Sequence, residues 1–134
     1  MEKILSDELR SAICKVGELI KADPRYTEMK ESTESYTGNK ELNSLLDEYS
    51  ALQTSLSAEY EKADFDASVV KPIRDRMDEI YSSVMDNGIY VRFKEASEAY
   101  RDLTDAVYEE LEYAVTGERR VECTHDCSTC HGCD

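Results

Sequence analysis

The sequence contains no tryptophan and few residues that turn a chain, with 5 glycines and 2 prolines among 134 residues. Such a composition favours helices. No segment alternates apolar and polar residues with a period of two, so no strand is predicted. No run approaches the ~18 apolar residues that span a bilayer, and no Gly-rich phosphate loop is present. These absences predict a protein without membrane insertion.

Basic residues are outnumbered by acidic ones, 16 against 30, which gives a formal net charge of −14. Nucleic-acid binding depends on Lys and Arg that neutralise phosphates, so direct nucleic-acid binding is not predicted. The acidity favours solubility, with an acidic docking surface as the alternative. The opening MEKILSDELR carries charges where a secretory signal would be apolar, so we expect a cytoplasmic protein.

Histidine is also scarce, because the only two lie within the last twelve residues. A di-iron bundle needs Glu-x-x-His on facing helices, and that motif is absent. A Ser–His or Cys–His nucleophile pair would have to use the terminal histidines. Acidic stretches such as DELR and EELE are typical of solvated helix faces. We therefore predict no enzyme and no catalytic residues.

Apolar residues recur with steps of three and four in five segments, which predicts an all-α fold. Capping residues support the boundaries: Ser6 and Asn39 precede helices, and Gly117 follows the last one. The expected helices cover about 6–21, 24–37, 40–62, 69–87 and 90–116. We divide the chain into a helical domain, 1–117, and a non-regular Cys-rich metal-binding tail, 118–134.

The last predicted helix is long, roughly 40 Å at 1.5 Å per residue, which exceeds the ~30 Å diameter of a small domain. We expect the fourth and fifth helices to form an elongated hairpin that leaves apolar surface near its ends. A second chain would cover that surface, most simply in a two-fold dimer. The alternative is a monomeric bundle with a kinked long helix.

The tail ends in CTHDCSTCHGCD, which holds four of the five cysteines. Beyond Val121 it has no large aliphatic or aromatic residue, so it cannot fold around its own core. Clustered cytosolic cysteines favour metal or redox chemistry over disulfides, and two-residue gaps let thiolates converge on one centre. Gly132 permits the bend that this requires. The predicted ligands are Cys123, Cys127, Cys130 and Cys133.

Thiolates select zinc, copper(I) or iron–sulfur clusters. Four-sulfur zinc sites usually have two Cys pairs separated by a longer loop, whereas all four cysteines here lie within eleven residues. Bacterial ferredoxins use C-x2-C-x2-C-x3-C, and this chain has those gaps in reverse order. We predict an iron–sulfur cluster, with [4Fe–4S] favoured and zinc as the alternative. His125 or His131 could replace a cysteine, or both could be spectators.

Other uses of the cysteines stay open. The tail cysteines could form disulfides, scavenge metals, or act as a thiol redox pair, Cys127-x-x-Cys130 or Cys130-x-x-Cys133. A redox pair normally needs a helix N-terminus to lower a thiol pKa, and no thioredoxin-like strand pattern is present. Cys14 is predicted opposite the apolar stripe of the first helix, where it is either exposed or covered by a partner.

Two segments together resemble the YlbF/YmcA family. The first is SAICKVGELIKADPRYTEMKESTESYTGNKELNSLLDEYSAL, and the second is IRDRMDEIYSSVMDNGIYVRFKEASEAYRDLTDAVYEELEYAVTG. The order and spacing of their apolar positions carry the resemblance, which extends over about 5–117. It implies an all-helical protein that forms a homodimer or joins related helical chains.

The resemblance also implies a function. Family members regulate bacterial competence, biofilm formation and sporulation. Two of them associate with a third protein, YaaT, in a complex that binds iron–sulfur clusters through cysteines and assists mRNA processing by ribonuclease Y. We therefore expect a non-enzymatic regulatory adaptor whose tail cysteines hold the cluster. The alternative is a zinc-binding structural interaction module.

Overall fold

The computed structural model describes residues 4–119, and α-helices make up most of this range. No strand occurs within it, so the all-α prediction is confirmed. Each predicted helix is present, and its boundaries lie within two residues of those expected. The helices are α1 (Asp7–Ala22), α2 (Pro24–Thr37), α3 (Lys40–Tyr60), α4 (Ala67–Met85) and α5 (Gly88–Thr116).

The ends of the helices are fixed by the capping residues seen in the sequence. The Ser6 hydroxyl accepts the N–H of Leu9 at 3.1 Å, and the Asn39 side chain accepts the N–H of Leu42 at 2.9 Å. Gly117 ends α5 with a φ of 73°, a left-handed conformation that side chains with a Cβ rarely adopt. Each cap satisfies backbone groups that the helix itself leaves unpaired.

A single residue, Asp23, separates α1 from α2 and caps both. Its extended backbone turns the chain between the two helices. Its carboxylate accepts the backbone N–H of Arg25 and pairs with the Arg25 guanidinium, each at 2.9 Å. The side-chain and backbone hydrogen bonds from Arg25 lower the pKa of Asp23 to about 2.

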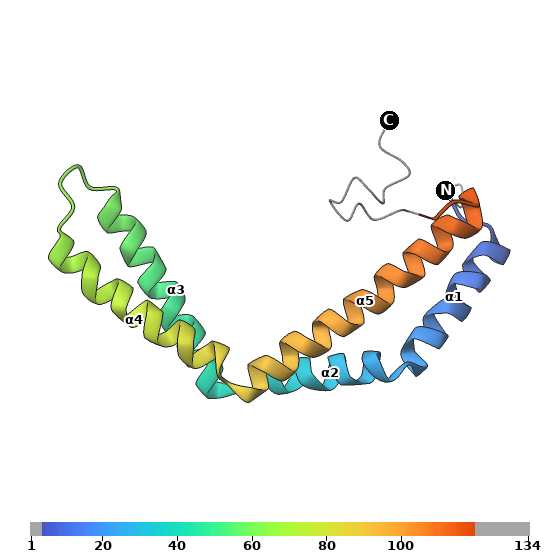
Figure 1. Cartoon of the computed structure of the whole chain (residues 1–134), viewed down its shortest axis with the longest axis horizontal. Helices are drawn as coiled ribbons and strands as arrows, with labels where there is room; N and C mark the ends of the chain where they lie inside the picture. Colours follow the sequence, from blue (N-terminus) through green and yellow to red (C-terminus); the bar gives the residue numbers. More distant parts are fainter. Residues whose placement is uncertain (1–3, 120–134) are drawn as a thin grey trace, which may run out of the picture.

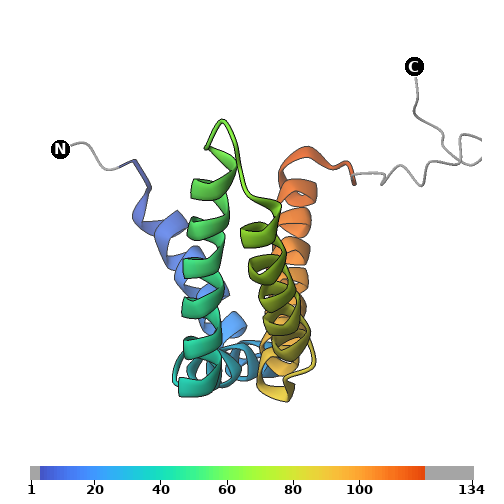
Figure 2. The ribbon, with the colours of Figure 1, turned by 90° about the vertical axis from the view of Figure 1, so that its left-hand side faces the viewer.

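The helices form a V with two arms (Figure 1). α3 and α4 are an antiparallel hairpin that forms one arm, and α5 packs along α2 in the other arm. α1 continues that second arm beyond α2, and Figure 2 shows that it diverges from α5 toward its start. Figure 2 shows α3 and α4 next to each other along their length. The chain therefore crosses between the arms twice, once from α2 to α3 and once from α4 to α5.

The core lies where the arms meet, a region we call the elbow. Leu42, Ile80 and Val84 are at most 4% exposed there. The Tyr36 ring stacks on the Phe93 ring with 4.3 Å between centroids. Seven partly buried residues surround the core: Tyr36, Leu45, Leu46, Tyr49, Leu52, Ile89 and Tyr90. The elbow is thus packed by four helices, whereas the arms leading from it have fewer neighbours.

The prediction that the fourth and fifth helices form a hairpin is wrong. α4 pairs with α3, α5 pairs with α2, and α4 meets α5 only at the elbow. The break between them is short, because Asp86 ends α4 and Asn87 caps α5 by accepting the N–H of Ile89 at 2.9 Å. So short a break bends the chain without reversing it. The elongated, helical character of the fold is as expected.

Candidate interaction surfaces

The predicted metal ligands cannot be placed, because they lie outside the described residues. These are Cys123, Cys127, Cys130 and Cys133, together with His125 and His131. Within residues 4–119, no group of three or more His, Cys, Asp or Glu side chains could hold a metal ion. The fifth cysteine, Cys14, is exposed on α1, which agrees with its predicted position opposite the apolar stripe.

The apolar stripe of α1 is largely uncovered. α1 contains no buried residue, and the helix that it contacts most is α2, which follows it in the chain. We call the exposed members of this face the α1 stripe. They are Leu9, Ile13, Val16 and Leu19, which are 50%, 51%, 42% and 61% exposed. The sequence predicted this stripe as a face of the helix, and in this chain it lacks a covering helix.

The end of α5 also exposes apolar side chains. Tyr108, Leu111 and Val115 are 71%, 58% and 78% exposed, although they lie on a helix whose first half is packed on α2. α1 begins at the same end of this arm (Figure 1). Clustered exposed apolar residues mark interaction sites more often than isolated ones do. This end of the molecule therefore resembles a docking surface for another protein chain.

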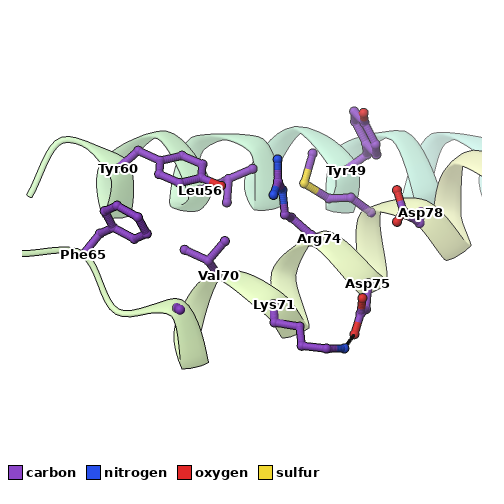
Figure 3. Close-up of a pocket in the computed structure, with 11 residues that line it drawn as sticks. Tyr49, Leu56, Tyr60, Phe65, Val70, Lys71, Arg74, Asp75 and Asp78 are labelled. Carbon is purple, nitrogen blue, oxygen red and sulfur yellow. Dashed lines mark hydrogen bonds and ion pairs between the residues drawn. The ribbon is translucent and has the colours of Figure 1, made fainter.

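A groove lies between α3 and α4, toward the loop that joins them (Figure 3). Its volume is about 730 Å³. Tyr60 and Phe65 meet edge to face with ring centroids 5.3 Å apart, and the Arg74 guanidinium lies 5.9 Å from the centre of the Tyr60 ring. Eleven residues line it: Tyr49, Leu56, Tyr60, Phe65, Ala67, Val70, Lys71, Arg74, Asp75, Met77 and Asp78.

A buried carboxylate holds the loop beside this groove in place. Glu59 is 7% exposed, accepts the backbone N–H of Asp66 at 3.1 Å and pairs with the Lys62 ammonium at 2.7 Å. The hydrogen bond from Lys62, followed by that from the Asp66 backbone, lowers the pKa of Glu59. These contacts fix the loop between α3 and α4 against the end of α3, and the loop places Phe65 opposite Tyr60.

Sequence reasoning missed this groove. The predicted helices end at 62 and begin again at 69, so the segment ADFDAS, which contains Phe65, is predicted only as the connection between them. The available signal was Phe65 itself, a large apolar ring in an otherwise small and acidic connection. Arg74 carried no such signal, because charged residues occur throughout α4.

The fold and the exposed faces together define an all-α protein with uncovered apolar surface. Comparison with known families then gives the class. The model of the family described as "Control of competence regulator ComK, YlbF/YmcA" matches residues 11–116. This chain belongs to the YlbF/YmcA family, as its sequence patterns suggested.

No curated protein and no solved structure was found to match the chain. Within residues 4–119, no helix is both long enough and apolar enough to cross a bilayer. The family match includes all of the α1 stripe except Leu9, and it includes the whole α3–α4 groove.

Proposed function

We propose that this protein is a non-enzymatic regulatory adaptor that docks to other protein chains through its helical body and holds an iron–sulfur cluster in its tail. The observation that carries the docking proposal is the exposed α1 stripe, on a chain that belongs to a family of competence regulators. A stripe of four half-exposed aliphatic side chains is costly to leave in water, at about 25 cal/mol per Å² of apolar surface. A partner helix that covers it would recover that free energy.

The proposed partners come from the family resemblance. A YaaT-like protein and, through it, ribonuclease Y would place the adaptor in mRNA processing, with competence, biofilm formation and sporulation as the processes affected. A homodimer, or a complex with related helical chains, would form the scaffold. The net charge of −14 argues against direct contact with the RNA and supports a role through proteins.

Docking through the α1 stripe can be tested by co-purification with the YaaT-like protein of the same cell. Ile13→Asp places a charge in the centre of the stripe and should abolish co-purification. Ser11→Asp adds the same charge to an exposed position on the other side of α1 and should leave it intact. Equal capture by both variants would exclude the stripe as the docking surface.

The cluster proposal rests on the donor set of the tail. Four thiolates within eleven residues, Cys123 to Cys133, provide the soft ligands that iron–sulfur clusters and zinc use. Bound there, a cluster would supply sensitivity to iron or oxygen. The four cysteines would be the residues that hold it.

Purification without oxygen, followed by iron and acid-labile sulfide assays, tests this part of the proposal. Wild-type protein should be coloured and should contain both elements. Replacing the four tail cysteines with serine should remove them, whereas Cys14→Ser, the matched control outside the tail, should not. Colourless protein with stoichiometric zinc would contradict the cluster and favour the zinc-binding interaction module.

A further inference from the structure

The end of α5 holds a guanidinium of this chain between an aromatic ring and a carboxylate. The Arg119 guanidinium carbon lies 4.2 Å from the centre of the Tyr113 ring, and its Nη1 lies 2.6 Å from a carboxylate oxygen of Glu110. Glu110 and Tyr113 are three residues apart in the helix, so their side chains lie on the same face. A ring face and a carboxylate together suit the flat, always charged guanidinium group.

The same pair of residue types occurs earlier in α5. Asp105 and Tyr108 have the same separation of three residues, and both are exposed, Tyr108 to 71%. Within residues 4–119, Asp105 forms no ion pair, and no Arg or Lys lies over the Tyr108 ring. This second pair therefore has the kinds of group that hold Arg119 at the first pair, without a cation from the described part of the chain.

Tyr108 also begins a row of exposed apolar side chains. Leu111 and Val115 follow it at helical steps of three and four and are 58% and 78% exposed. α2 cannot cover them, because it has 14 residues against the 29 of α5 and packs on the first half of α5. We call Asp105, Tyr108, Leu111 and Val115 the α5 row. Its spacing is that of one face of a helix, which suits a second helix laid along it.

The charge of this part of α5 indicates the charge of its occupant. From Asp102 to Thr116 the helix has five carboxylates and no Lys or Arg. A second copy of this chain, with its own net charge of −14, is repelled here. A segment that carries arginine brings the complementary charge. Arginine suits an exposed tyrosine beside a carboxylate better than lysine does, because its planar group can stack on the ring while its N–H groups reach the carboxylate.

We propose that the α5 row docks an arginine-bearing amphipathic helix of a different protein. The arginine of that helix lies over the Tyr108 ring and pairs with the Asp105 carboxylate, as Arg119 does at its own pair. Apolar side chains of the same helix cover Leu111 and Val115. This inference rests on the proposed function, in which the body docks to other proteins. It adds a surface separate from the α1 stripe and states the chemistry of what binds there.

A helix library tests the chemistry of the occupant. The probe is a displayed library of amphipathic helical peptides, with leucines fixed along one face and with Arg, Lys, Gln or Glu at each flanking polar position. It is selected on the full chain and counter-selected on Leu111→Asp, which places a charge in the α5 row. Arginine should be enriched over lysine at one position beside the leucines. Enrichment of glutamate, of lysine as much as arginine, or of no residue type would overturn the proposal.

The selected peptide then measures the contact of its arginine with the α5 row. Fluorescence anisotropy follows its binding to the full chain, beside a peptide with neutral citrulline in place of the arginine. Citrulline should weaken binding to wild type at least about tenfold, since charge-assisted contacts are stronger than neutral ones. Tyr108→Ala and Asp105→Asn should each weaken the arginine peptide markedly and the citrulline peptide much less. An equal loss for both peptides would contradict a guanidinium at this pair.

A matched pair on α4 provides the control. Asp78 and Tyr81 have the same spacing, and Tyr81 is 57% exposed, but Val84, three residues further on, is buried. Asp78→Asn and Tyr81→Ala should therefore leave the affinity for the peptide unchanged. The substituted positions on both helices are exposed, so circular dichroism should show the same helix content in every variant. A loss like that of the α5 variants would mean that the α5 row is not the site.

Two further outcomes separate this inference from the function on which it rests. Ile13→Asp, on α1, should bind the selected peptide as wild type does while it loses the YaaT-like protein. Peptides selected without arginine, with that protein still captured, would overturn the α5 row alone. Peptide binding by a wild type that captures no YaaT-like protein would instead contradict the proposed function. Conversion of a wild-type dimer into a monomer by Leu111→Asp would place a second copy on the row and overturn this inference.

Discussion

At the scale of single residues, the fold is held by a small apolar core and by ion pairs between helices. Arg92 of α5 makes a two-pronged contact with Glu28 of α2, at 2.6 and 3.0 Å. Arg76 of α4 makes the same contact with Glu48 of α3, at 2.6 and 2.9 Å. Each pair joins two helices of one arm. These side chains are about half exposed, so solvent screens the ion pairs. The pairs therefore contribute more to the register of the helices than to the stability of the fold.

These pairs predict destabilisation in acid. Hydrogen bonding to the arginine lowers the pKa of Glu28 and of Glu48 from 4.5. A lowered pKa in the folded state contributes stability that is complete above the unfolded value, about 4.5, and is lost as the pH falls below it. The urea midpoint should therefore fall between about pH 5 and pH 3. The Glu28→Gln/Glu48→Gln double variant should be less stable at neutral pH and should show a shallower acid dependence. Equal slopes for the two proteins would refute this explanation.

The elbow core predicts a large effect from one truncation. Leu42 is fully buried, so Leu42→Ala should lower the free energy of unfolding by about 2–5 kcal/mol. Leu9→Ala removes the same atoms from the half-exposed α1 stripe. This variant should change the free energy of unfolding by about 0.5 kcal/mol or less. Urea denaturation of both variants measures the difference. Similar losses would mean that the core does not lie at the elbow.

At the scale of helices, the elements were predictable and their pairing was not. Ser6, Asn39 and Gly117 are local signals, because a cap acts on the backbone within three or four residues of itself. The partner of each helix depends on how far the chain turns at its breaks. The chain could either reverse or bend at Asp86–Asn87, and the sequence at this break is compatible with both. The α3–α4 groove was missed for a similar reason, since it exists only once Phe65 returns to Tyr60.

The helix with the least tertiary packing is α1, and this predicts its dynamics. It has a strong apolar stripe but no buried residue, so little burial opposes its local opening. Backbone amides of α1 should exchange with deuterium much faster than those of α3 and α5 near the elbow. Adding a partner that covers the stripe should slow α1 selectively. Slow exchange of α1 in the isolated protein would contradict an uncovered stripe.

At the scale of the whole molecule, the V shape separates three roles. The elbow holds the buried core, the α3–α4 arm carries the groove, and α1 carries the exposed apolar stripe that we propose as a docking surface. The proposed cluster adds a fourth feature in the tail, outside the described residues. At this scale the sequence shows only the chemistry of the molecule, namely the cysteine spacing and the charge balance. Where the open faces lie depends on helix packing and could only be found from the structure.

Native mass spectrometry of the full chain, purified without oxygen, tests the central claim most directly, because it reads chain number and inorganic content in one spectrum. The account predicts two chains together with the mass of one iron–sulfur cluster per chain, which is lost when the four tail cysteines are replaced by serine. A single chain at the bare polypeptide mass would contradict it, both in the self-association of the body and in the chemistry of the tail.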